Sequence, residues 1–159
     1  MPRDQKYIAG NQLPPAGIVS LAKEYDCKSI SYTYTEPTIY FEYALDTAKL
    51  AKKKGIKNVF VTNGYITPEA LEEIAPYLDA ANIDLKAFTD KFYQRNCGAH
   101  LQPVLDSIKL HKKHGISTKL GWWYKRVADF ARNRQCPIGL IQFEDDFITD
   151  VEVEVLGGK

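Results

Sequence analysis

The sequence has few cysteines, and those it has are widely separated. Cys27, Cys97 and Cys136 are its only three. An odd, scattered set is typical of a reducing cytoplasm rather than of a disulfide scaffold, and none of the three belongs to a CxxC-type metal pair. We therefore expect a cytoplasmic protein.

The sequence also lacks excess charge and long apolar runs. Its 21 Lys and Arg residues nearly balance its 20 Asp and Glu residues, so nothing indicates electrostatic attraction to nucleic acid or to an anionic membrane. No apolar stretch approaches the roughly 20 residues that span a bilayer. Residues 1–15 are polar and lack the apolar centre of a signal peptide. We expect neither a nucleic-acid partner nor a membrane partner.

What is present is an alternation of helical and strand-like segments. With 159 residues, 45% of them hydrophobic, the chain is long enough for a globular domain with a core. Periodicity and capping residues predict helices at about 14–25, 37–54, 67–76 and 102–114. Runs rich in β-branched, aromatic and other apolar residues predict strands at about 29–34, 58–62 and 79–88. Such alternation indicates an α/β fold with a parallel sheet.

The character of the sequence changes after Gly115. Residues 118–135 are expected to form an amphipathic helix, and residues 137–143 and 150–156 are expected to form strands. We therefore divide the chain into residues 1–115 and an atypical α+β tail at residues 116–159.

Polar residues gather where the three predicted strands end. Glu36 follows the first strand, Thr62 and Asn63 end the second, and Asp84 and Lys86 alternate with apolar residues in the third. In parallel α/β sheets the carboxyl ends of the strands form the ligand site. The residue chemistry suits a zwitterion joined to a sugar, with Glu36 on an ammonium, Asp84 on ribose hydroxyls and Lys86 on a carboxylate.

Gly64 is expected to let the backbone approach the ligand closely. Simpler interpretations of these residues remain open. Asp84 and Lys86 are also compatible with a plain ion pair, and Asn63 with Gly64 is a common turn pair. Glu36, directly before Pro37, is equally an acid favoured by the dipole of the following helix.

Two histidines lie three residues apart near the end of the last predicted helix. His111 and His114 have the spacing of a metal-binding pair. They are flanked by lysines at a helix end, where the helix dipole favours cations, so a solvated cationic helix end is the preferred interpretation.

Four motifs, taken in order, carry a resemblance to a known family. They are "YTYTEP" at 32–37, "VTNGY" at 61–65, "NIDLKAF" at 82–88 and "FYQRNCGAHLQPVLDSI" at 92–108. Over residues 14–115 the sequence resembles radical S-adenosylmethionine enzymes. Within these it is similar to the branch of pyruvate formate-lyase activating enzyme and the radical enzyme of the AmmeMemoRadiSam group. The resemblance implies a partial TIM-like barrel of βα units, incomplete at its N-terminal end.

The resemblance also implies a cofactor and a reaction. Glu36 matches the residue that holds the methionine amino group of S-adenosylmethionine, and Asp84 and Lys86 match the strand that contacts its ribose and carboxylate. Thr62 and Asn63 would line the neighbouring strand end. In the complete enzyme, a reduced 4Fe-4S cluster would cleave the cofactor. The resulting 5′-deoxyadenosyl radical would take hydrogen from a small substrate or from a glycine of a protein partner.

Parts of the family pattern are missing from the sequence. The CxxxCxxC loop that binds three irons of the cluster would precede residue 1, and Thr35 stands where the family usually has Asn. Neither the strand nor the "PGxND"-like stretch that the family pattern leads us to expect follows Gly115. We therefore expect an internal piece of the barrel that on its own neither binds the cluster nor cleaves the cofactor.

Two other functions remain open. One is a barrel lyase or aldolase in which Lys86 forms a Schiff base and Asp84 assists proton transfer. The other is a non-catalytic truncated module, built on half a barrel, whose open sheet edges pair with another copy to form a homo-oligomer.

Overall fold

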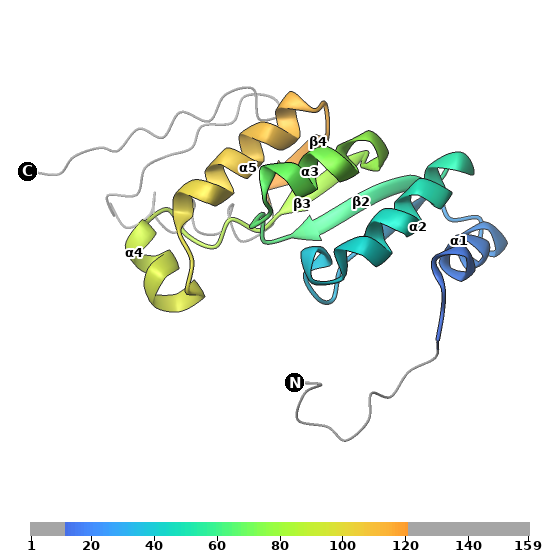
Figure 1. Ribbon diagram of the computed structural model, residues 1–159, viewed down its shortest axis with the longest axis horizontal. Helices are drawn as coiled ribbons and strands as arrows, with labels where there is room; N and C mark the ends of the chain where they lie inside the picture. The colour runs from blue at the N-terminus through green and yellow to red at the C-terminus, as the bar shows by residue number, and fades with distance from the viewer. Residues whose placement is uncertain (1–11, 121–159) are drawn as a thin grey trace, which may run out of the picture.

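The fold is built on one parallel β-sheet. The structure is a computed structural model that describes residues 12–120. Its sheet has the order β1-β2-β3-β4 with every neighbouring pair parallel (Figure 1). The strands are β1 (Ser29–Tyr32), β2 (Lys57–Thr62), β3 (Ala80–Ile83) and β4 (Ser117–Leu120). The predicted α/β class with a parallel sheet is confirmed.

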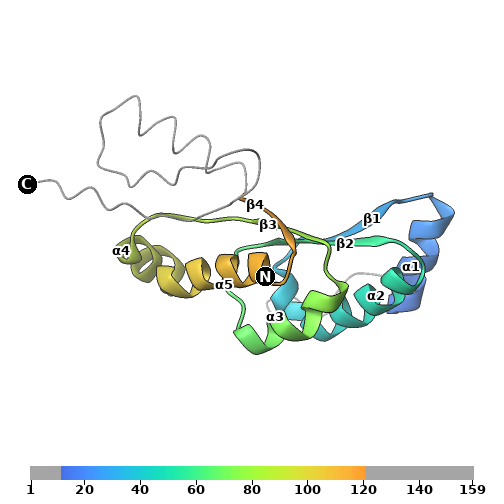
Figure 2. The same ribbon diagram turned by 90° about the horizontal axis from the view of Figure 1, so that it is seen from above.

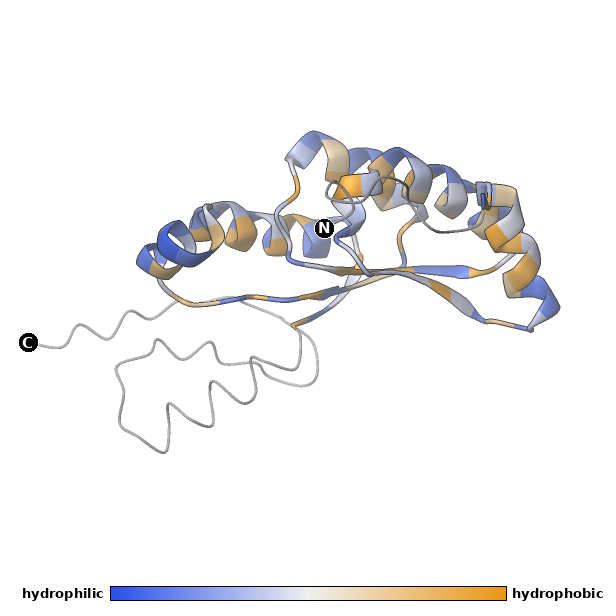
Figure 3. Ribbon diagram, turned by 90° about the horizontal axis from the view of Figure 1, so that it is seen from below, coloured by the Kyte–Doolittle hydropathy of each residue, from blue (hydrophilic) through white to orange (hydrophobic). Residues whose placement is uncertain are grey.

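Helices connect the strands in the expected places. They are α1 (Pro15–Glu24), η2 (Pro37–Tyr40), α2 (Phe41–Lys53), α3 (Pro68–Ile74), η3 (Ala75–Tyr77), α4 (Asp90–Phe92), η4 (Tyr93–Cys97) and α5 (Leu101–Lys113). Figures 2 and 3 show α1, α2, α3 and α5 on the same side of the sheet. Within residues 12–120 the arrangement is thus one layer of helices on one layer of strands.

The core lies between these two layers. Tyr32, Phe60 and Ala81 lie side by side in the strand register, and all three are buried. They pack with buried side chains of the helices, which include Ala44, Ala48, Leu71, Ile74, Val104 and Ile108. Strand side chains alternate between the two faces, so the neighbouring positions face away from these helices. The row Ser31, Val59, Ala80 and Ser117 on that opposite face has only small or medium side chains.

Local sequence signals explain where several helices begin and end. The Thr67 hydroxyl oxygen accepts a hydrogen bond from the Ala70 amide at 3.3 Å, and Pro68 occupies the first turn of α3. Lys52 and Lys53 lie in the last turn of α2, and Gly55 beyond it has φ 73°. These features agree with the sequence-based expectations.

The third strand is shorter than predicted, because its length depends on its neighbour. β3 ends at Ile83, opposite Thr62, the last residue of β2. After Thr62 the chain turns away at Gly64, which has φ 76°. Asp84 still donates its amide to the Thr62 carbonyl at 2.8 Å, but Leu85 and Lys86 lie beyond the strand. The predicted alternation is kept, since Ile83 and Leu85 are buried.

Three further expectations were wrong. The strand expected to be missing after Gly115 is present as β4, which pairs with β3, and residues 118–120 belong to it rather than to a helix. The rest of the predicted tail lies outside the described residues. His111 is not a solvated cation, because it is only 1% exposed and its Nδ1 lies 2.8 Å from the Ser107 carbonyl oxygen. The sequence placed it correctly near the end of α5, but on the wrong face of that helix. The division of the chain at residue 115 stays a prediction.

No helix within residues 12–120 is both long and apolar enough to cross a membrane.

Candidate functional site

Glu36 lies between β1 and η2 and reaches across to the end of β2. One of its carboxylate oxygens accepts the Thr62 hydroxyl at 2.5 Å, and the other accepts the Asn63 amide at 2.7 Å. Glu36 is the N-cap residue of η2, yet its side chain makes no capping hydrogen bond. The contacts therefore favour a role at the strand ends over the simpler role of a helix-entry acid.

Thr62 stands behind Glu36 rather than at the surface. Its side chain faces the helices and the residue is only 3% exposed. The hydroxyl donates to Glu36 and accepts the Gly64 amide at 3.0 Å. Both hydrogen-bonding roles of this hydroxyl are thus used within the protein, and its direct effect is to orient the Glu36 carboxylate.

Asn63 and Gly64 form the turn that ends β2. The Asn63 side-chain oxygen accepts the Tyr65 amide at 2.8 Å, which closes a local turn. A Cβ atom on Gly64 would lie 2.7 Å from Ile83 Cγ2 and 3.2 Å from Val104 Cγ1. The sequence suggested that Gly64 admits a ligand, whereas in the structure it admits the close packing of β3 and α5.

Asp84 and Lys86 form an ion pair just beyond β3. The Lys86 Nζ lies 3.0 Å from Asp84 Oδ2, with the Lys and Asp side chains 43% and 31% exposed. A pair this accessible contributes less than about 1 kcal/mol to stability. The ion pair expected as the simpler interpretation is therefore present, but both side chains remain accessible to a ligand.

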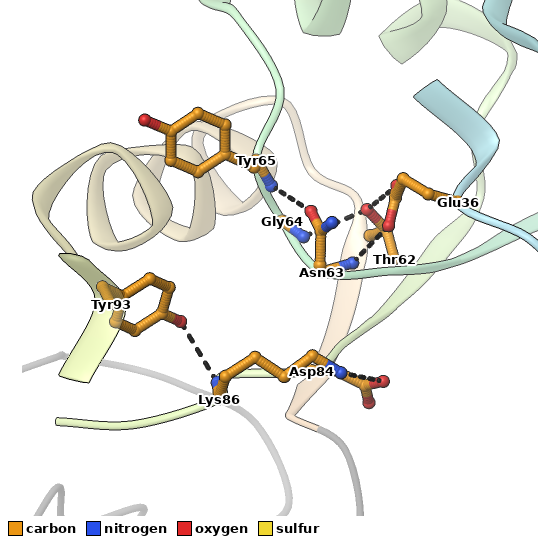
Figure 4. Close-up of polar contacts among 8 residues, drawn as sticks. All are labelled: Glu36, Thr62, Asn63, Gly64, Tyr65, Asp84, Lys86 and Tyr93. Atoms are coloured by element: carbon orange, nitrogen blue, oxygen red, sulfur yellow. Dashed lines mark hydrogen bonds and ion pairs between the residues drawn. The ribbon is translucent and has the colours of Figure 1, made fainter. Parts of the chain in front are cut away.

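The two groups lie at the same, carboxyl edge of the sheet. Figure 4 shows Glu36, Thr62 and Asn63 as one hydrogen-bonded group, and Asp84 with Lys86 as another. The Asp84 amide joins them through its hydrogen bond to the Thr62 carbonyl. The five residues proposed from the sequence thus lie at one edge of the sheet, but in two groups. Glu36 is held by the Thr62 side chain, which faces the helices, whereas Asp84 follows the helix-facing Ile83 and so points away from them.

A buried tyrosine supports this edge and was missed in the sequence. Tyr93 is 3% exposed, and its hydroxyl oxygen accepts the Lys86 amide at 3.1 Å. Burial raises the pKa of Tyr93 against the opposing effect of hydrogen bonds from the Lys86 and Ala87 backbone, so the phenol is protonated at neutral pH. In the sequence, only membership of the motif at 92–108 distinguished Tyr93. Its contact with Lys86 crosses a turn, so no local sequence pattern predicts it.

A small cavity opens beside these residues. It has a volume of about 300 Å³ and is lined in part by Asn63, Lys86, Tyr93 and Cys97. Residues with an amide, an ammonium and a phenol thus contribute to one concave surface. Such a mixture of polar groups on a concave rim is typical of small-molecule sites.

The described residues offer no cluster of metal ligands. Among residues 12–120, no group of three or more His, Cys, Asp and Glu side chains is arranged to hold a metal ion. Cys27 and Cys97 are exposed and free, and Cys136 lies outside the described residues. The side chains of residues 12–120 therefore do not fit a 4Fe-4S cluster.

Three curated proteins resemble the chain in sequence. An uncharacterized protein of Methanocaldococcus jannaschii is 49% identical over 109 residues, which are 69% of this chain and 32% of that protein. A 7-carboxy-7-deazaguanine synthase of Thermococcus kodakarensis is 33% identical over 93 residues, 58% of this chain and 36% of that protein. A 4-hydroxyphenylacetate decarboxylase activating enzyme of Clostridium scatologenes is 23% identical over 114 residues, 72% of this chain and 36% of that protein. The chain thus spans about a third of the length of these relatives.

Two solved structures share the fold. A domain of the pyruvate-formate lyase-activating enzyme of Bacteroides vulgatus aligns with a TM-score of 0.50 at 20% identity, over 56% of this chain and 55% of that one. SuiB of Streptococcus suis, solved with S-adenosylmethionine bound, aligns with a TM-score of 0.57 at 19% identity, over 84% of this chain and 34% of that one. These matches confirm the expected partial (βα) barrel.

The family assignment comes from the sequence match. A model described as the Radical SAM superfamily matches residues 2–124, more than half of the chain. The four motifs that suggested this resemblance all lie inside the matched range. The chain belongs to the radical S-adenosylmethionine superfamily.

Proposed function

We propose that Glu36, Asp84 and Lys86 form one side of an S-adenosylmethionine site in a radical enzyme of the glycyl-radical activating type. The observation that carries the proposal is the position of these side chains. They come from the ends of neighbouring parallel strands, where α/β proteins bind their ligands. Membership of the superfamily and a fold shared with an S-adenosylmethionine-bound protein support it.

The residues present fit the cofactor group by group. Each Glu36 oxygen accepts one internal hydrogen bond, and a carboxylate has about four lone-pair sites, so acceptor capacity is left for an ammonium. Asp84 is accessible for two ribose hydroxyls. Lys86 is accessible for the methionine carboxylate and already holds a carboxylate, that of Asp84.

The chain's own part in the reaction is to bind and orient. When bound next to a reduced 4Fe-4S cluster, S-adenosylmethionine supplies a 5′-deoxyadenosyl radical that removes hydrogen from a substrate. Glu36 would fix the amino acid end of the cofactor, while Asp84 would fix the ribose. Because the 159 residues contain no CxxxCxxC segment, we propose that cluster binding requires residues beyond these 159.

A protein is the substrate class that we favour for the complete enzyme. One relative, matched over 72% of this chain, is an activating enzyme of a decarboxylase. A second relative is a synthase whose name indicates a small-molecule product, so relatedness alone does not decide between the classes. Of the two, we favour the protein substrate because the activating enzyme is matched over more of this chain, 72% against 58%.

Cofactor binding is testable by calorimetry without the cluster. We expect the chain to bind S-adenosylmethionine, and Glu36→Gln and Lys86→Met each to weaken binding about tenfold, as for a lost charged contact. Lys57→Met is the matched control, because Lys57 forms a comparable ion pair with Asp79 at 2.8 Å, at the start of β2. Absence of binding by the wild type, or equal loss in all three variants, would overturn the proposal.

A further inference from the structure

Lys86 lies in a segment that the sheet does not hold on the β2 side. β2 ends at Thr62, and the last bond of sheet type on that side runs from the Asp84 amide to the Thr62 carbonyl. Lys86 follows two residues later. The position of its backbone therefore depends on contacts from outside β2.

Tyr93 provides such a contact. Its hydroxyl oxygen accepts the Lys86 amide at 3.1 Å, and the residue belongs to the buried core cluster (Figure 4). The Tyr93 ring is fixed by the core, and its hydroxyl in turn fixes the Lys86 backbone. A buried hydroxyl at this distance restrains the backbone directly, whereas an exposed one would exchange with water.

The segment that carries Tyr93 is itself well anchored. Tyr93 begins η4, a π-helical turn, and its carbonyl accepts the Ala99 amide at 3.3 Å. The Asp90 carboxylate accepts the Leu101 amide at 2.8 Å and the Gln94 side-chain amide at 2.5 Å. These bonds tie the segment to the start of α5. π-helical turns are rare and occur frequently at functional sites.

We propose that Tyr93 is a positioning residue for the cofactor site, which acts through the Lys86 backbone and does not touch the ligand's reacting atoms. The inference rests on the proposed function, because it assigns Tyr93 to the same S-adenosylmethionine site. It adds a residue that lies outside the strand-end motifs. If Tyr93 has this role, removal of its hydroxyl oxygen lowers the affinity of the site for the amino acid part of S-adenosylmethionine.

Tyr93→Phe tests this with two ligands. Calorimetry should show about fivefold weaker binding of S-adenosylmethionine, the effect of about one lost hydrogen bond. Binding of 5′-methylthioadenosine, which keeps the ribose but lacks the amino acid carboxylate, should change much less. Equal loss for both ligands would overturn the role assigned to Lys86.

Tyr32→Phe is the matched control for a merely structural effect. Tyr32 is also a buried core tyrosine, and its hydroxyl donates to Asn58 Oδ1 at 2.9 Å. We expect it to lower stability like Tyr93→Phe while leaving S-adenosylmethionine affinity unchanged. In a Lys86→Met background, Tyr93→Phe should cause no further loss of affinity, because both changes act on one contact. Additive losses, or equal losses in the two tyrosine variants, contradict the inference.

Two outcomes separate this inference from the proposed function. If the wild type binds no S-adenosylmethionine, both are overturned. If the wild type binds and Tyr93→Phe binds equally well, only the role of Tyr93 is overturned. Should Tyr93→Phe fail to fold, amide hydrogen exchange in the wild type decides. The Lys86 amide should be protected like that of Asp84, and an unprotected Lys86 amide contradicts the inference.

Discussion

Replacing Thr62 by valine should separate the orientation of Glu36 from the packing around it. Valine has nearly the shape of threonine, so the buried volume is kept and only the hydroxyl is lost. That hydroxyl donates to the Glu36 carboxylate at 2.5 Å and accepts the Gly64 amide at 3.0 Å. One change therefore removes two hydrogen bonds at the carboxyl edge of the sheet.

The expected cost follows from the two groups left behind. A hydrogen bond to a charged group contributes about 1.5–3 kcal/mol, and an unsatisfied buried amide costs about 1–3 kcal/mol. Glu36 keeps its bond from the Asn63 amide and is only half-buried, so water compensates part of its loss. We expect the free energy of unfolding to fall by about 3 kcal/mol.

Urea denaturation at pH 7.5 measures this loss. Thr47→Val is the matched control: Thr47 is also buried, but its hydroxyl donates to the Tyr43 carbonyl at 2.8 Å, within helix α2. It should cost about 1 kcal/mol or less. Thr62→Val should also weaken S-adenosylmethionine binding, because Glu36 loses the bond that orients it. Thr62→Ser keeps the hydroxyl and should bind S-adenosylmethionine like the wild type. Equal costs for the two valine variants would refute the account of Glu36.

Three further predictions concern pH, backbone conformation and the cluster. Burial lowers the pKa of His111 from 6.5, so the unfolded chain binds its proton first and stability falls as pH drops below about 6.5. Urea denaturation at pH 7.5 and pH 5 should show His111→Gln losing this dependence and the exposed His114→Gln keeping it; equal pH dependence in both would contradict it. Gly64→Ala should destabilise the protein by about 2 kcal/mol or more, because φ is 76° and the new Cβ would lie 2.7 Å from Ile83 Cγ2. Thermal melting measures this loss, and a melting midpoint equal to that of the wild type would contradict the prediction. Iron and sulfide should not assemble a stable 4Fe-4S cluster on the 159 residues, as judged by visible absorbance; a stable cluster with cofactor cleavage would refute this.

The sequence predicted most of the fold because its signals are local. Apolar spacing marked the helices, and Thr67 with Pro68 marked the start of α3. The rule that parallel strands end at a common edge then placed Glu36 and Lys86 at the same edge of the sheet from the sequence alone. These inferences need only the identity of nearby residues and one general property of α/β sheets.

What the sequence did not predict depends on distant neighbours. β3 ends at Ile83 because β2 turns away after Thr62, 21 positions earlier. His111 is buried because of how α5 packs, although lysines follow it in the chain. Tyr93 supports Lys86 across a turn whose shape is set by Asp90 and its partners. Such contacts are decided by tertiary packing, which local patterns do not contain.

Asp84 and Lys86 lie where the sequence predicted, but their contacts differ from the predicted ones. The sequence placed them with Glu36 around one ligand, and the structure brings all three to one edge. In the structure Lys86 pairs with Asp84, and Glu36 takes its hydrogen bonds from the end of β2. Binding of S-adenosylmethionine would therefore exchange the Lys86–Asp84 contact for contacts with the cofactor, while Glu36 would keep its internal bonds and use its remaining acceptor capacity.

Titration of the ¹⁵N-labelled chain with S-adenosylmethionine, followed by two-dimensional NMR, tests the central claim most directly. Backbone amide signals of Asn63, Gly64, Asp84 and Lys86 should shift in a saturable manner. Those of Lys57 and Asp79, at the opposite edge of the sheet, should stay in place. No saturable shifts at the carboxyl edge, or shifts confined to the amino edge, would contradict the account.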